Sequence, residues 1–190
     1  MKKLLYTLLA VSIIFSACVE KDTASTNNNN SALAIGDTHQ GGIIFYLDGN
    51  GGGLIAAPSD QSYGWGLGNA CWGCNGAGLK SYHGWVYAAY IGSGAQNTID
   101  IEAGCTTPGT AADICANLTL GGYSDWFLPS KDELYEMYLN KAAIGDFAGS
   151  VYWSSTQFDN GKAWTQSLGY GQQNRDYKNE YWNVRAVRAF

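Results

Sequence analysis

Near the start of the folded region, the hydrophobic pattern shows two apolar runs separated by a short polar break. The runs cover residues 42–47 and 53–57, and the break between them has the sequence Asp-Gly-Asn-Gly-Gly. Glycine, asparagine and aspartate tolerate the positive φ angles that a tight chain reversal requires. The pattern therefore predicts a β-hairpin.

The most strongly marked helix begins after Ser130. Ser130 and Glu133 have the spacing of a capping box, in which each side chain hydrogen-bonds the backbone N–H of the other residue. Three apolar residues then recur at the spacing of one helix face: Leu134, Met137 and Tyr138. We expect this face to be buried and the helix to end before Gly145.

Two shorter helices are predicted upstream. Thr98 is the expected N-cap of a helix over residues 99–105, and Thr107-Pro108 has the character of a second helix start that runs to Leu118. The glycine pair 121–122 ends it. The segment between Ser59 and Gly94 has frequent glycines and aromatic residues but no clear period, so we expect a long loop region there.

Three strands are expected after the capped helix, with polar loops between them. They cover residues 151–155, 163–168 and 184–189. Trp126 and Trp153 are expected to be core residues, while Ser154 and Ser155 are expected to fix turns. Arg185 and Arg188 lie three residues apart, so in a strand they point to opposite faces, and at least one should be exposed or paired with a carboxylate.

Residues 1–17 have the pattern of an export signal. Lys2 and Lys3 precede an apolar run over residues 4–15 that is too short for a membrane span. The run ends at Phe-Ser-Ala-Cys, which resembles a bacterial lipobox, so Cys18 is the expected lipidation site and mature N-terminus. The alternative is an ordinary signal peptide with Cys18 as an incidental thiol.

Residues 18–34 are expected to form a disordered linker, because they are polar and include four consecutive asparagines. The folded domain is then residues 35–190. Glu20 and Asp22 resemble the acidic sorting signals of surface-exported lipoproteins. We therefore expect a lipid-anchored protein of the bacterial cell envelope, at the outer membrane and exposed on the surface.

Composition and net charge narrow the classes of partner that the protein is expected to bind. The chain has 25 Gly, 13 Tyr and 7 Trp, which is typical of a loop-rich fold held by aromatic packing. Its net charge is -5, and removal of residues 1–17 deletes Lys2 and Lys3 and no acid, giving -5 - 2 = -7. A general polyanion binder is basic, so nucleic acid and sulfated glycans are disfavoured unless a local basic patch exists.

Four cysteines remain after Cys18: Cys71, Cys74, Cys105 and Cys115. In an exported protein an even number predicts two disulfides, with three possible pairings. Cys71 and Cys74 also have the spacing of a redox motif, but they lie in a glycine-rich loop and not at a helix start. Zinc bound by Cys71, Cys74 and either Cys105 or His83 is a further alternative, although no second CxxC supports it.

A set of short motifs spreads over nearly the whole predicted domain. They are Gly36-Asp37 with residues 41–45, Asn97-Thr98 with Cys105, Ala111-Ala112 with Cys115, GYSDWFLPS at 122–130, YWSS at 152–155 and VRAVR at 184–188. With these motifs the chain resembles the C-terminal domain family of the Legionella collagen-like adhesin. It is also similar to a related paralogous domain of Fibrobacter-type surface proteins.

The resemblance implies an α+β, C-type-lectin-like fold: a twisted antiparallel sheet with two or three short helices and a long loop region. The best-known relatives bind extracellular glycans or surfaces. The calcium-dependent sugar motifs of true C-type lectins are missing, since Trp182-Asn183 is followed by Val184 and not by an acid. We therefore expect no calcium-dependent sugar binding, no metal and no cofactor.

Polar and aromatic residues in the segments between Trp153 and Val184 are the candidate ligand-binding residues. Tyrosine and tryptophan give large contact areas at low entropic cost, and amides and carboxylates add directed hydrogen bonds. The candidates are Phe158, Asp159, Asn160, Tyr170, Gln172, Asn174, Arg175, Tyr177, Tyr181 and Trp182. The alternative is that these loops are solvated and that some rings close the core.

These observations favour a non-catalytic adhesion module that recognises an extracellular glycan or protein ligand. His39 and His83 have no serine or cysteine partner pattern of a catalytic triad. A second hypothesis is a variable C-terminal loop over residues 170–183, diversified by a retroelement. A third is a thiol enzyme of the formylglycine-generating type that uses Cys71 and Cys74.

Overall fold

The computed structural model describes residues 32–62, 69–74, 80–81, 84–85, 88–148 and 151–190. The predicted export signal, Cys18 and most of the predicted linker lie outside these residues. From Ala32 onward the chain forms a single unit. None of the helices in the described ranges is long and apolar enough to cross a bilayer.

The first sheet has the strand order β1-β2-β3-β11, and all its pairings are antiparallel. Its strands are β1 (Thr38–His39), β2 (Gly42–Leu47), β3 (Gly53–Ala56) and β11 (Val187–Ala189). The hairpin β2–β3 confirms the prediction. Its turn is closed by the Asp48 carboxylate, which accepts hydrogen bonds from the N–H groups of Asn50 at 2.7 Å and Gly52 at 3.0 Å.

The second sheet has the order β4-β10-β7-β8-β9. Its strands are β4 (Asn69–Ala70), β10 (Trp182–Asn183), β7 (Val151–Gln157), β8 (Lys162–Ser167) and β9 (Gln173–Tyr177). All its pairings are antiparallel except that of β10 with β7. A small hairpin of β5 (Lys80–Ser81) and β6 (Gly84–Trp85) stands apart from both sheets.

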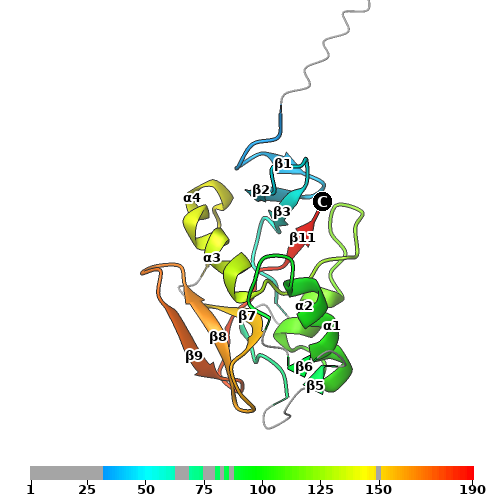
Figure 1. Ribbon diagram of the computed structural model, residues 1–190, viewed down its shortest axis with the longest axis vertical. Helices are drawn as coiled ribbons and strands as arrows, with labels where there is room; N and C mark the ends of the chain where they lie inside the picture. Colours follow the sequence, from blue (N-terminus) through cyan, green and yellow to red (C-terminus); the bar gives the residue numbers. More distant parts are fainter. Residues whose placement is uncertain (1–31, 63–68, 75–79, 82–83, 86–87, 149–150) are drawn as a thin grey trace, which may run out of the picture. The chain divides into compact units, whose positions relative to one another are not determined.

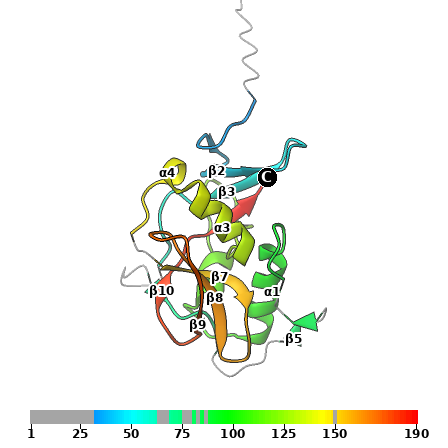
Figure 2. The same ribbon diagram turned by 60° about the vertical axis from the view of Figure 1, so that its left-hand side comes forward.

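The prediction of one antiparallel sheet is therefore wrong in detail, because the strands form two principal sheets, and of the strand expected over residues 184–189 only Val187–Ala189 belongs to a sheet. The chain pairs through Asn183 with β7 and then through Val187 with β3. Between them, the Val184 carbonyl accepts the N–H of Gln61, and Phe127 forms a bridge with Val187. The C-terminal segment thus links the two sheets, and Figure 2 shows β11 beside β3.

The helices are α1 (Gly94–Gly104), α2 (Ala111–Ala116), α3 (Lys131–Leu139) and α4 (Lys141–Ile144). In Figure 1, α1 and α2 lie on one side of the unit, and α3 and α4 lie on the other. Two mixed groups of strands with a few short helices make this an α+β fold.

The capped helix α3 confirms the prediction. The Ser130 side chain accepts the Glu133 N–H, and the Glu133 carboxylate accepts the Ser130 N–H at 2.7 Å. Glu133 is fully buried and also accepts the N–H of Gly92 at 2.7 Å. One carboxylate therefore caps α3 and fixes the start of α1.

The predicted starts of the two upstream helices are wrong by a few residues. α1 begins after Ser93, so Thr98 lies inside the helix and does not cap it. The Thr98 hydroxyl donates to the Gly94 carbonyl and accepts the Leu128 N–H. α2 begins after Thr110, whose side chain accepts the Asp113 N–H, and not at the Thr107-Pro108 pair. Thr98 therefore makes a tertiary contact from within α1, and Thr110 is the N-cap of α2.

Both predicted core tryptophans are buried. Trp126 and Trp153 belong to one hydrophobic cluster that also contains Trp72, and the Trp153 indole N–H donates to the Ala70 carbonyl at 2.8 Å. A second cluster lies under α3 and includes Phe45, Leu134, Met137 and Tyr152. The interior of the domain is thus built from two hydrophobic clusters, both rich in aromatic residues.

Both arginines of the VRAVR segment near the C-terminus, Arg185 and Arg188, are buried and paired with carboxylates. Arg185 bonds Asp60, with Nε 2.7 Å from Oδ1, and Arg188 bonds Asp125. The Arg188 hydrogen bond holds the pKa of Asp125 below its ordinary value. The prediction that at least one of the two would be exposed or paired with a carboxylate is confirmed, since both are paired.

Candidate functional site

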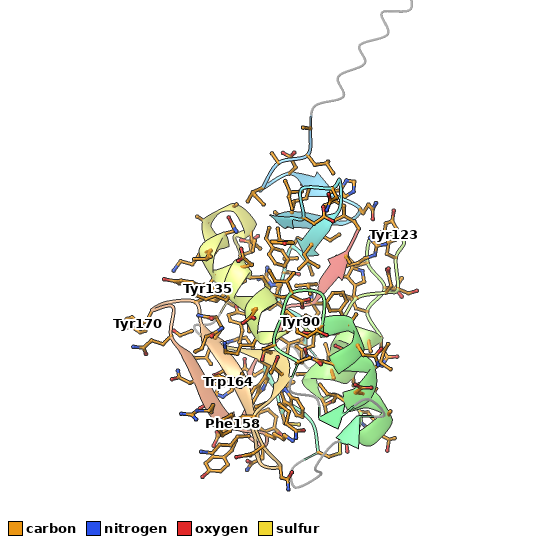
Figure 3. The ribbon with its side chains drawn as sticks, viewed as in Figure 1. Tyr90, Tyr123, Tyr135, Phe158, Trp164 and Tyr170 are labelled. Carbon is orange, nitrogen blue, oxygen red and sulfur yellow. A yellow bond between two sulfur atoms is a disulfide. The ribbon has the colours of Figure 1, made fainter. Side chains whose placement is uncertain are left out.

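An open hollow lies on the outer half of the second sheet, where β8 and β9 meet the turn that precedes β8. Its volume is about 600 Å³. Its lining residues are aromatic, cationic or polar: Phe158, Lys162, Trp164, Gln173, Asn174, Arg175 and Asp176. We refer to these seven residues as the β8–β9 groove, and Figure 3 shows Phe158 and Trp164 close together within it.

The register of β8 and β9 sets which of these side chains share a face. Trp164 lies opposite Arg175, and Lys162 lies opposite Tyr177. Directly opposed residues of an antiparallel pair point to the same side of the sheet. Ala163, between the two β8 residues, is fully buried in the core on the other side. Rings and cations are therefore gathered on the outward face.

Helix α3 borders the same face. Lys131, its first residue, places Nζ 5.1 Å from the centroid of the Trp164 ring. The Gln173 side-chain amide donates to the Lys131 carbonyl at 3.0 Å, which ties the start of α3 to β9. The capping box at Ser130 thus positions a cation at the groove as well as starting a helix.

The aromatic rings of the groove are packed against cations. The Arg175 guanidinium lies 4.6 Å from the Phe158 ring and 5.5 Å from the Trp164 ring. Phe158 meets Trp164 edge-on, with ring centroids 5.7 Å apart. Lys162 Nζ lies 4.5 Å from the Tyr177 ring. Such contacts are worth about 0.5–1 kcal/mol each at exposed sites, enough to orient these side chains before a ligand arrives.

The acids near the groove are already engaged. The Asp176 carboxylate accepts the Thr165 hydroxyl at 2.7 Å. The Asp159 carboxylate accepts the N–H groups of Gly161 and Lys162, which fixes the turn before β8. The groove therefore offers ring surfaces and two cations, Lys162 and Arg175, with Lys131 beside it, in a protein whose net charge is negative. This is the local basic patch that the overall charge could not reveal.

Three of the ten predicted ligand-binding residues line the groove: Phe158, Asn174 and Arg175. Four more lie around it. Asp159 and Asn160 belong to the turn before β8, Tyr177 contacts Lys162, and Gln172 precedes β9. Tyr170 is 84% exposed at the turn between β8 and β9.

The other two predicted residues lie across the sheet. Tyr181 and Trp182 are at β10, which pairs with the opposite edge of β7. Trp182 is partly buried against the first hydrophobic cluster, so it closes the core, as the alternative interpretation held. Tyr181 is 63% exposed but does not line the groove.

The prediction that these residues lie in loops is wrong for Asn174, Arg175 and Tyr177, which belong to β9. Edge strands often carry charged and polar side chains, which discourage pairing with another chain at the free edge. β9 gains its order from five opposed residue pairs with β8 and from the Thr165–Asp176 hydrogen bond.

Sequence reasoning missed four residues of the groove and the lysine beside it: Lys131, Lys162, Trp164, Gln173 and Asp176. A signal for Trp164 was present. Ala163 and Thr165 alternate with it along a strand, and if these two small residues face the core, Trp164 faces outward. Lys131 carried no such signal, because its contact with Trp164 depends on tertiary packing.

The four cysteines of the described part of the chain form one disulfide and not two. Cys74 is bonded to Cys105, while Cys71 and Cys115 are free thiols. Cys115 is fully buried on α2, and the Cys71 carbonyl accepts the Ala111 N–H at the start of that helix. Burial raises the pKa of both free thiols. Neither thiol therefore has the lowered pKa of a redox or nucleophilic cysteine.

The zinc alternative fails on the same disulfide, because Cys74 and Cys105 cannot supply thiolates while they are bonded to each other. Across the described ranges, no three His, Cys, Asp or Glu side chains come together in a way that could hold a metal ion. His83 lies outside those ranges. His39 packs edge-on against Phe190, with ring centroids 4.6 Å apart.

Comparison with known proteins gives one family. The family model described as the Lcl C-terminal domain matches residues 69–188, which is more than half of the chain. No curated protein matches the chain. A solved fimbrial protein from Bacteroides ovatus ATCC 8483 is 14% identical with a TM-score of 0.46, a similarity too low to carry an argument. The match covers 88% of this chain and 40% of the fimbrial protein, so the chain spans less than half of that length.

Proposed function

Because the chain belongs to the Lcl C-terminal domain family, we propose that it is an adhesion-type binding module that holds an extracellular glycan in the β8–β9 groove. The observation that carries this proposal is the arrangement around Trp164, which has Lys131 and Arg175 near its ring and Phe158 at its edge. Aromatic rings accept the CH faces of sugars, and the flanking polar groups bond hydroxyls.

The cations select the kind of glycan. Lys162 and Arg175 line the groove, Lys131 lies beside it and also pairs with the exposed Asp132 at 3.4 Å, and the one lining carboxylate, Asp176, is bonded to Thr165. A glycan with carboxylate or sulfate groups would gain charge-assisted hydrogen bonds there. A protein ligand with acidic side chains would use the same cations, but it would not need the ring surfaces. The rings favour the glycan.

Binding without catalysis and without calcium is part of the proposal. The raised pKa of the Cys71 thiol and the bonding of Cys74 to Cys105 weigh against a thiol enzyme that uses these two residues. We also propose that the fold is C-type-lectin-like. In support, both principal sheets are mainly antiparallel, and a long segment of very short strands separates β3 from α1.

Replacing Trp164 by Ala is expected to weaken glycan binding by about tenfold or more, since one buried aromatic anchor often dominates a binding site. A glycan array probed with the full chain would identify acidic ligands, and titration calorimetry would compare the variant with the wild type. The matched control is Tyr181→Ala, which removes an exposed tyrosine outside the groove.

Arg175→Ala is the companion variant. It should weaken acidic glycans more than neutral ones, and wild-type binding should fall as salt rises, because exposed charges are screened. Chelation of calcium should leave binding unchanged. Equal loss in Trp164→Ala and Tyr181→Ala, or no loss in either, would remove the groove as the binding site.

A second candidate function is display of a diversified segment over residues 170–183. Its exposed side chains favour it: Tyr170, Gln172, Asn174, Arg175, Tyr177 and Tyr181. Most of these residues lie on or beside β9, whose backbone pairing would hold a changing surface in place. A near-identical template repeat with a reverse transcriptase gene beside this gene would support the idea, and their absence would end it.

Anchoring at the cell envelope follows from the predicted lipidation of Cys18. A lipid chain on a polar linker would hold the domain at the outer membrane and leave the groove free to meet extracellular glycans. Cys18→Ser should release the protein from the membrane fraction. Retention of this variant at wild-type levels would contradict the lipid anchor.

A further inference from the structure

Lys178 is a fully buried lysine that does not line the groove. It directly follows β9, where its N–H donates to the Gly161 carbonyl at 2.9 Å and its carbonyl accepts the Trp72 N–H at 2.9 Å. Its Nζ lies 4.6 Å from the centroid of the Trp72 ring. Burial lowers the pKa of Lys178 to about 8, so the neutral amine is accessible near neutral pH. The fold thus holds an amine of raised reactivity at a fixed place in the interior.

The side chain that meets this amine is an amide. Gln157, the last residue of β7, is fully buried, and its Oε1 accepts a hydrogen bond from Lys178 Nζ at 3.0 Å. The Nε2 atom of the same amide is also buried, but it has no hydrogen-bond partner among the described residues. Buried polar atoms are nearly always bonded, so an amide nitrogen without a partner calls for an explanation.

The two side chains have the chemistry of a nucleophile and an electrophile. A lysine amine that is desolvated beside an apolar ring loses its proton more easily and attacks carbonyl carbons. The carboxamide carbon of Gln157, Cδ, is bonded directly to the oxygen that Lys178 Nζ contacts. Their backbones are fixed by β7 and by the bonds of Lys178 to Gly161 and Trp72, so the two groups are held together without a further loss of entropy.

We propose that Lys178 and Gln157 join in an isopeptide bond within the folded chain. The neutral Nζ forms a bond to Cδ, and the Cδ–Nε2 bond breaks with its electron pair going to Nε2. The proton that Nζ gives up passes to Nε2, which leaves as ammonia. The Asp159 carboxylate, whose charge acts on Lys178, relays this proton. The step consumes no oxidant, reductant or cofactor, and it removes the one atom of the Gln157 side chain that lacks a partner.

The bond would close the hairpin that carries the groove. Gln157 and Lys178 are 21 residues apart, and the segment between them contains all of β8 and β9. A covalent closure of this length limits the unfolded chain as a disulfide does. The hairpin would then keep its two ends together when a bound surface pulls on it. This cross-link does not depend on which ligand the groove binds.

Peptide mapping of the full wild-type chain tests the proposal directly. Trypsin cannot cleave after a lysine whose amine is acylated, so the peptide over residues 142–162 should appear joined to the peptide over residues 176–185. The mass of the joined pair should be the sum of the two peptides less one ammonia. Fragmentation should place the junction at Gln157 and Lys178. Two separate, linear peptides with cleavage after Lys178 would overturn the proposal, and so would a loss of ammonia placed at any other residue.

Two single substitutions should abolish the joined pair. Lys178→Arg keeps a cation but removes the nucleophile, and Gln157→Glu replaces the amide by a carboxylate, which an amine does not attack. The matched control is Lys141→Arg, because the Lys141 amine contacts the Leu168 carbonyl and no side-chain amide. This variant should keep the joined pair. Ammonia loss from residues 142–162 that persists in Lys178→Arg would contradict the cross-link, and if either variant fails to fold, the wild-type map alone decides.

Discussion

Replacement of Asp60 by Asn is expected to lower the free energy of unfolding by about 3–5 kcal/mol, because it leaves a buried guanidinium without its counter-charge. The side chain of Arg185 is 0% exposed and that of Asp60 is 7% exposed. The other carboxylate oxygen of Asp60 accepts the Tyr152 hydroxyl at 2.7 Å and the Ala148 N–H at 3.1 Å. Urea unfolding monitored by circular dichroism would measure the change.

The matched control is Asp132→Asn. Asp132 pairs with Lys131 at 3.4 Å, but its side chain is 47% exposed, and exposed pairs are worth about 0–1 kcal/mol. The two substitutions make the same chemical change at a buried and at an exposed pair. Similar losses in the two variants would show that the Asp60–Arg185 pair does not hold the C-terminal segment in place.

Removal of the Cys74–Cys105 disulfide is the second large effect. The bonded residues are 31 apart in the sequence, and closing a loop of that length stabilises a fold by about 3–4 kcal/mol in the chain-entropy model. The double variant Cys74→Ser, Cys105→Ser should lose that amount. Cys105 also ends α1, where its N–H donates to the Ile101 carbonyl. We therefore expect α1 and β4 to be the first elements that lose their structure in this variant.

Reductant separates the disulfide from the serine substitutions. It should destabilise the wild type by about the same amount and leave the double variant unchanged. Cys71→Ser is the control, because Cys71 is a half-buried free thiol. Peptide mapping that found Cys71 bonded to Cys74 or to Cys115 would contradict the pairing seen here.

Local signals in the sequence were sufficient for the hairpin and for α3. The Asp48 turn and the Ser130–Glu133 box act within four residues, so their patterns can be read directly from the chain. The remaining errors have long-range causes. Asp60 and Arg185 are 125 residues apart, and their pairing helps to guide the segment after β10 from one sheet to the other.

The sequence placed the candidate binding residues between Trp153 and Val184, but it did not indicate how they are arranged around the groove. Phe158, Asn174 and Arg175 were identified from residue type alone, while Trp164 was missed. Trp164 could have been found from its alternation with Ala163 and Thr165 on β8, whereas a polar edge strand such as β9 has no apolar alternation to identify it. Lys131 reaches the groove only because α3 packs beside β8.

The central claim is that ligand binds on the outward face of β8 and β9. Amide chemical shifts of the labelled full chain, recorded as an acidic glycan is added, test it most directly. The largest changes should fall on Phe158, on β8 from Lys162 to Trp164, and on β9. Changes concentrated instead at the hollow of about 460 Å³ lined by Ile99, Asn117 and Trp126 would contradict the claim and place the binding site between α1, the end of α2 and the segment of residues 124–127.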